Sequence, residues 1–158
     1  MYRIELDRLM GGRLSPVFAL VSGLSYLLVG ILQILSSFGL IAPIMGFSDI
    51  VGGFLLIIIA SVFLSGVKPL LEKDQEGFAF LTVGFILAGI MFGLQLLVIL
   101  TNSLGWILGF QNWLSWNIMN DLTPSLWMFF ILLIMAGLLW VEGSLREKTQ
   151  GAKRGVRK

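Results

Sequence analysis

Long apolar runs alternate with short polar segments along the chain, and this pattern predicts four membrane-spanning helices. A bilayer core about 30 Å thick requires roughly 20 apolar residues of helix. Runs of about that length cover residues 16–35, 49–67, 77–100 and 124–141. The first and fourth begin with a hydroxyl residue followed by proline, a pair typical of a helix start. We therefore expect an all-α, polytopic membrane protein with its four transmembrane helices packed as an antiparallel bundle.

The first apolar run has a second interpretation, as a cleaved secretory signal peptide. The apolar core of a signal peptide is typically about 7 to 15 residues long, and a cleavage site of small residues follows it. Residues 16–35 form a longer run, and no A-x-A-like site comes after it. We therefore expect this run to remain in the protein as a span.

Residues 104–117, "LGWILGFQNWLSWN", lie between the third and fourth runs and carry no charge. At 100° per residue, a helix here would place Trp106, Phe110 and Trp113 on one side and mostly polar residues on the other. This pattern predicts a short amphipathic helix lying flat at the membrane surface, with its rings at headgroup depth. Trp127 and Trp140, near the two ends of the fourth run, are predicted as further interfacial anchors. An alternative function for 104–117 is a lid or docking surface for a hydrophobic ligand or a partner subunit.

Composition supports the membrane class and excludes much chemistry. Of the 158 residues, 57% are hydrophobic and only 13% are charged, against roughly 25% charged in soluble domains. Cysteine and histidine are both absent, which excludes disulfides, thiolate nucleophiles, Cys/His zinc sites and bis-histidine haem. We expect no cofactor, no metal site and no catalytic residues, and the protein is predicted not to be an enzyme.

The basic residues predict the orientation in the membrane. They precede the first run, lie between the second and third, or follow the fourth, and residues 36–48 and 101–123 contain none. With four spans these basic segments share one side, and the positive-inside rule places both termini in the cytoplasm. We expect a multi-pass protein of the cell membrane, with a single domain over residues 1–148. Residues 149–158 are expected to form a basic, disordered cytoplasmic tail, and the net charge of +2 is too small to indicate nucleic acid as a partner.

A few polar residues interrupt the apolar runs. They form a candidate intramembrane patch of Ser22, Ser25, Tyr26, Ser61 and Gln95. Such residues usually form hydrogen bonds between helices; the alternative is a small polar patch in a pocket for a lipid or a quinone-like molecule. No ionisable residue lies in the middle of any run, which argues against ion-coupled transport.

Two pairs of small residues predict close packing between helices. Gly89 and Gly93 form a GxxxG pattern, and Ser61 and Ser65 have the same spacing, which lets helix backbones approach closely. The sequence therefore favours a non-catalytic accessory or scaffold subunit of a membrane complex. The alternative is a small facilitator or binder of a hydrophobic ligand without ion coupling. The expected partners are the lipid bilayer and either other membrane subunits or further copies of the chain.

Overall fold

The computed structural model describes residues 14–42 and 49–155, and within these ranges all regular structure is helical. The elements are α2 (Leu14–Ser37), α3 (Ile50–Leu71), α4 (Gln75–Ile107) and α5 (Pro124–Gly155), with 3₁₀ turns η1 (Gln111–Trp113) and η2 (Ile118–Asn120). Each predicted run falls on one of the four long helices. Among the described residues, α2, α3 and α4 are long and apolar enough to cross a membrane, while the apolar part of α5, Pro124–Leu138, is shorter.

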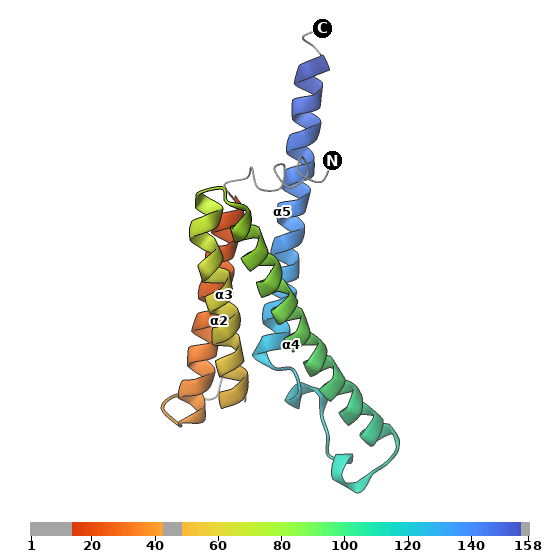
Figure 1. The fold of residues 1–158 in the computed structure, drawn as a ribbon. Coiled ribbons are helices and arrows are strands. Elements are labelled where there is room, and N and C mark those ends of the chain that lie inside the picture. The colour runs from red at the N-terminus through yellow and green to blue at the C-terminus, as the bar shows by residue number, and fades with distance from the viewer. Residues whose placement is uncertain (1–13, 43–48, 156–158) are drawn as a thin grey trace.

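Helices α2 and α3 lie side by side over most of their length (Figure 1). Glycine makes this approach possible, because a Cβ on Gly30 would lie 2.8 Å from the carbonyl oxygen of Gly53. In the other direction, a Cβ on Gly53 would lie 2.9 Å from the carbonyl oxygen of Gly30. Both distances are to backbone atoms, which cannot rotate away. The two glycines therefore mark a place where the backbones of α2 and α3 come close together.

Helices α2 and α4 end in the same way, with a glycine in the left-handed conformation. Gly39 and Gly109 both have φ of 71°. At the end of α4, Phe110 donates its N–H to the carbonyl of Gly105, and Gly109 donates to that of Trp106. These two bonds form a Schellman motif, which satisfies carbonyls that a helix end leaves free.

The turn between α3 and α4 is very short. Lys73 adopts a positive φ of 59°, the one non-glycine residue in the described ranges to do so. Asp74 then donates its N–H to the carbonyl of Pro69 and accepts a bond from the N–H of Glu76. Asp74 therefore closes the end of α3 and caps the start of α4 at the same time.

The apolar core lies where α2, α3 and α5 meet. Tyr26 of α2, Phe63 of α3 and Leu132 of α5 are each at most 2% exposed, and Phe129 of α5 joins the same cluster. The later part of α4 is different. After Ala88 its only buried residue is Gly105, and it runs away from α2 and α3 (Figure 1). The structure therefore contains the four long helices, with the later part of α4 standing apart from α2 and α3.

Residues 104–117 do not form the single helix that the sequence predicts. Helix α4 continues to Ile107, and the chain then turns at Gly109 into η1, so one continuous helix does not form. The physical reason is the positive φ of Gly109, which ends a right-handed helix. Residues 108–123, the returning segment, instead fold back along α4. In this segment Asp121 accepts a hydrogen bond from Gln95, about three turns of helix before the end of α4.

The tail predicted to be disordered also differs, because α5 continues through residues 149–155 to Gly155. The segment is rich in glutamate, lysine, arginine and glutamine, which are good helix formers. It extends an existing helix, so no new nucleation step is needed. Residues 156–158 of the predicted tail, and residues 1–13 of the predicted domain, lie outside the described ranges.

Candidate functional site

Two groups of polar residues occupy opposite parts of the structure. The first is the α2 stripe, formed by four buried residues on one face of α2: Ser22, Tyr26, Gln33 and Ser36. The second is the Asp121 network, in which side chains of α4 and of the returning segment are hydrogen-bonded: Gln95, Asn102, Trp113, Trp116 and Asp121.

The α2 stripe arises from helical periodicity. Positions 22, 26, 33 and 36 fall within about 80° of one another at 100° per residue, and this face lies against α3 and α5. Exposure is 3% for Ser22, 2% for Tyr26 and 3% for Gln33. The stripe is therefore fully withdrawn from the surface of the chain.

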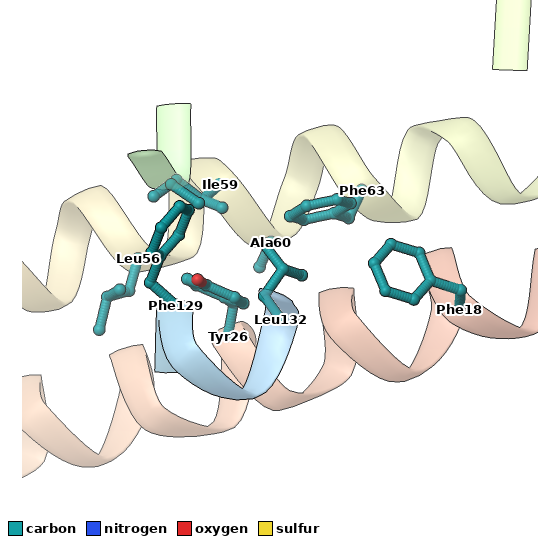
Figure 2. Close-up of a cluster of buried hydrophobic side chains, with 9 residues drawn as sticks. Phe18, Tyr26, Leu56, Ile59, Ala60, Phe63, Phe129 and Leu132 are labelled. Carbon is teal, nitrogen blue, oxygen red and sulfur yellow. The ribbon is translucent and has the colours of Figure 1, made fainter. Parts of the chain in front are cut away.

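The surroundings of Tyr26 are apolar. Its ring lies 6.0 Å from that of Phe63, and Figure 2 shows the tyrosine between α3 and α5, with Leu56, Ile59 and Phe129 around its hydroxyl end. Within the part of the chain that the structure describes, the Tyr26 hydroxyl has no hydrogen-bond partner.

Each of the other three stripe residues also has a buried oxygen without a hydrogen-bond partner among the described residues: Ser22 Oγ, Gln33 Oε1 and Ser36 Oγ. A buried polar group without a partner costs about 1–3 kcal/mol, and membrane hydrocarbon supplies none. Four such atoms on one helix face are the most unusual chemical feature in the described structure.

The polar patch predicted from the sequence is only partly assembled. Ser22 and Tyr26 come together on the stripe, with Ser25 half-buried beside them. Ser61 is exposed on α3 and donates to the carbonyl of Ile58 in its own helix, while Gln95 belongs to the Asp121 network. Gln33 and Ser36 were missed, although their spacing from Tyr26 places them on the same helix face.

The Asp121 network ties the returning segment to α4. The Asp121 carboxylate oxygen Oδ2 accepts bonds from Asn102 Nδ2 at 2.8 Å and from Trp116 Nε1 at 2.7 Å. The Asp121 carbonyl accepts from Gln95 Nε2 at 2.9 Å, and Trp113 Nε1 donates to Asn102 Oδ1 at 3.0 Å. Sequence reasoning missed this network because it treated residues 104–117 as a separate element. The one available signal was an aspartate in a segment without any basic residue.

The predicted interfacial anchors behave in two ways. Trp106, Phe110 and Trp127 are 52%, 55% and 46% exposed, so their rings are free to meet lipid. Trp113 instead packs on Gly105, where a Cβ would lie 2.7 Å from the indole Cδ2. Trp140 is part of α5, but its side chain lies outside the described residues.

The small-residue pairs predicted for helix packing make no close contact between helices among the described residues. Ser61 and Ser65 are exposed. A Cβ on Gly93 would meet nothing within 4 Å, and one on Gly89 would meet only the Phe129 ring at 3.7 Å. Close contacts within the chain are made by other glycines, such as Gly30 with Gly53 and Gly84 with Phe63.

Apolar helices of membrane-crossing length, with many large apolar side chains exposed, define a helical integral membrane protein. In the described ranges no group of three carboxylates could hold a metal ion. The chain belongs to the MJ0565 integral membrane domain family, which it matches over residues 10–142. It is similar to the uncharacterized protein MJ0565 of Methanocaldococcus jannaschii, at 32% identity over 117 residues that cover 72% of this chain and 78% of the relative. No solved structure matches the chain.

Proposed function

We propose that the protein is a non-catalytic subunit of a complex in the cell membrane, which it crosses four times with both termini in the cytoplasm. The observation that carries this proposal is the unused small-residue face of α4. Gly93 has open space where a side chain would lie, and Gly89 is touched only by Phe129 at van der Waals distance. Small residues at this spacing are typical of contacts between membrane helices. A helix of another subunit fits this face.

The distribution of charge supports the proposed orientation. Lys68 lies in the last turn of α3 and Lys73 in the α3–α4 turn. The basic end of α5 lies toward the same end of the molecule (Figure 1). The opposite end, formed by residues 36–42, 49 and 101–123, contains two aspartates and no basic residue. Basic segments remain on the cytoplasmic side of membranes.

The test is purification from native membranes in a mild detergent, followed by mass measurement of the intact particle. We expect a larger particle with a second protein at fixed stoichiometry. Gly93→Leu should remove that protein while leaving the thermal unfolding of the chain unchanged. Gly137→Leu is the matched control, because Gly137 on α5 also has no atom within 4 Å of an added Cβ. A monomeric wild-type particle without a partner would contradict the proposal.

A second function is favoured by the α2 stripe: binding of a hydrophobic ligand such as a lipid or a quinone, without ion coupling. The buried hydroxyls of Tyr26 and Ser22 have no partner among the described residues, and a carbonyl oxygen on an apolar ligand would supply an acceptor. Helix α5 covers the Tyr26 end of the stripe with side chains that include Phe129 and Leu132. Because this region is buried, α5 would have to move for a ligand to reach it.

Native mass spectrometry distinguishes this second function from the first. A bound small molecule should be present in the wild type and weakened by Tyr26→Phe. Ser61→Ala is the control, since Ser61 is exposed and bonded within its own helix. If Tyr26→Phe leaves the bound mass unchanged, or if none is bound to the wild type, ligand binding at the stripe is excluded.

A further inference from the structure

The hydrogen bonds that the Asp121 side chain accepts do not require it to be negatively charged. Both hydrogen bonds that it accepts, from Asn102 and Trp116, end on Oδ2, and both donors are neutral. An asparagine could accept the same two bonds through its side-chain carbonyl. The second oxygen, Oδ1, receives no bond from any residue in the described ranges. These two hydrogen bonds hold the returning segment on α4 and explain the position of the Asp121 side chain. They do not explain why this side chain carries a negative charge.

Among the described residues, no basic side chain contacts this carboxylate. Residues 101–123 contain no lysine, arginine or histidine. The nearest other carboxylate at this end is that of Asp49, which already caps the N-terminus of α3 by accepting the N–H of Val51. Helix capping gives Asp49 a complete structural explanation. Asp121 is half-buried and has no comparable partner for its second oxygen.

The depth of the carboxylate suggests the source of a cation. Asp121 contacts Asn102, which lies two residues beyond Leu100, the last residue of the apolar run of α4. At 1.5 Å per residue this is about 3 Å past the apolar part, where hydrocarbon gives way to headgroups. The neighbouring surface carries exposed aromatic rings of Trp106 and Phe110, as expected at this boundary.

The surface of α4 that lies between the carboxylate and the middle of the apolar run is exposed and apolar, as a contact with acyl chains requires. Leu94 and Val98, which flank Gln95 on α4, are 53% and 47% exposed. A divalent cation is a poorer fit, since calcium and magnesium take about six or more oxygen ligands, and the described residues provide no such group. An ammonium group needs only one carboxylate oxygen.

We infer that Asp121 binds the ammonium group of a zwitterionic phospholipid, whose acyl chains lie along α4 beside Leu94 and Val98. Oδ1 accepts the ammonium proton, while Oδ2 keeps its bonds to Asn102 and Trp116. This site lies on the other side of α4 from Gly93, so it stands independently of the subunit contact proposed above.

The test uses purified protein in detergent with equal amounts of phosphatidylethanolamine and phosphatidylglycerol of identical acyl chains. Native mass spectrometry counts the lipids retained. The wild type should prefer phosphatidylethanolamine, and Asp121→Asn should lower this preference about two- to fivefold, the effect of one partly exposed ion pair. Asp49→Asn, which removes the other carboxylate at this end, should keep the wild-type preference.

A second measurement leaves the protein unchanged. Phosphatidylethanolamine acetylated on its nitrogen lacks the positive charge and should be retained no better than phosphatidylglycerol. Equal retention of the charged and acetylated lipids by the wild type would overturn the inference, as would an unchanged preference in Asp121→Asn. Complete displacement of the lipid by soluble ethanolamine would overturn it in favour of a free amine. A carbodiimide crosslink from Asp121 to a lysine of a co-purified protein would overturn it in favour of a protein partner.

Discussion

The indole ring of Trp113 lies directly against the backbone of Gly105 on α4. A Cβ on Gly105 would come within 2.7 Å of the indole Cδ2, and the indole N–H is hydrogen-bonded to Asn102 at 3.0 Å. The ring is therefore held from two sides. This contact fixes the returning segment on α4 and is one basis of the Asp121 network.

Gly105→Ala should destabilise the protein by about 1 kcal/mol. Alanine normally gains up to about 1 kcal/mol over glycine within a helix, but here the added methyl group collides with a ring that is not free to move. Gly93→Ala is the control on the same helix and should be neutral or stabilising, because nothing lies within 4 Å of its Cβ. Thermal unfolding followed by tryptophan fluorescence measures both. Equal effects of the two substitutions would show that Trp113 does not pack on Gly105.

The α2–α3 contact should be more sensitive. A methyl group on Gly30 or Gly53 meets a backbone carbonyl oxygen at 2.8 or 2.9 Å, and relieving the collision requires the two helices to separate. We expect each alanine substitution to cost about 1–3 kcal/mol, measured by thermal unfolding in detergent. Gly137→Ala, which meets nothing within 4 Å, should cost nothing. Unchanged stability in Gly30→Ala would contradict the close approach.

Tyr26→Phe should raise the stability of the ligand-free protein by about 1 kcal/mol. The substitution removes a hydroxyl that is buried without a partner in the described structure, and the cost of leaving such a group unsatisfied is then lost. The ring contact with Phe63 is kept. A chemical denaturation series on delipidated protein gives the measurement. A fall in stability would mean that the hydroxyl has a partner in the folded protein.

The proposed orientation makes opposite predictions for the two ends of the molecule. Glu72→Cys, at the α3–α4 turn, should be protected from an impermeant thiol reagent in intact cells, while Ser115→Cys, on the returning segment, should be labelled. Both positions are exposed, and the natural chain has no cysteine to interfere. Permeabilised cells, in which both should react, provide the control. Labelling of Glu72→Cys alone in intact cells would invert the topology.

The positions of the helices could be predicted from the sequence because they depend on a property of each residue taken singly. Twenty consecutive apolar residues form a helix in a membrane whatever their neighbours are. Which face a side chain occupies depends on the partner helix, so Ser61 was grouped with Tyr26 although the structure turns Ser61 outward. The periodicity of α2 did contain enough information to add Gln33 and Ser36.

The Asp121 network could not be predicted because it rests on one backbone dihedral. The amphipathic pattern of residues 104–117 is compatible with a helix, and Gly109 only weakens that helix without excluding it. Once Gly109 adopts its positive φ, the segment reverses and brings Trp113 to Gly105 and Asp121 to Gln95. These contacts join residues up to 26 positions apart, which no local pattern specifies.

The shared use of Asp74 at the α3–α4 turn has a mechanical consequence. Its N–H closes α3 and its carboxylate caps α4, and only residues 72–74 separate the two helices. A displacement of the first turn of α4 that moves Asp74 would therefore also disturb the hydrogen bond that closes α3.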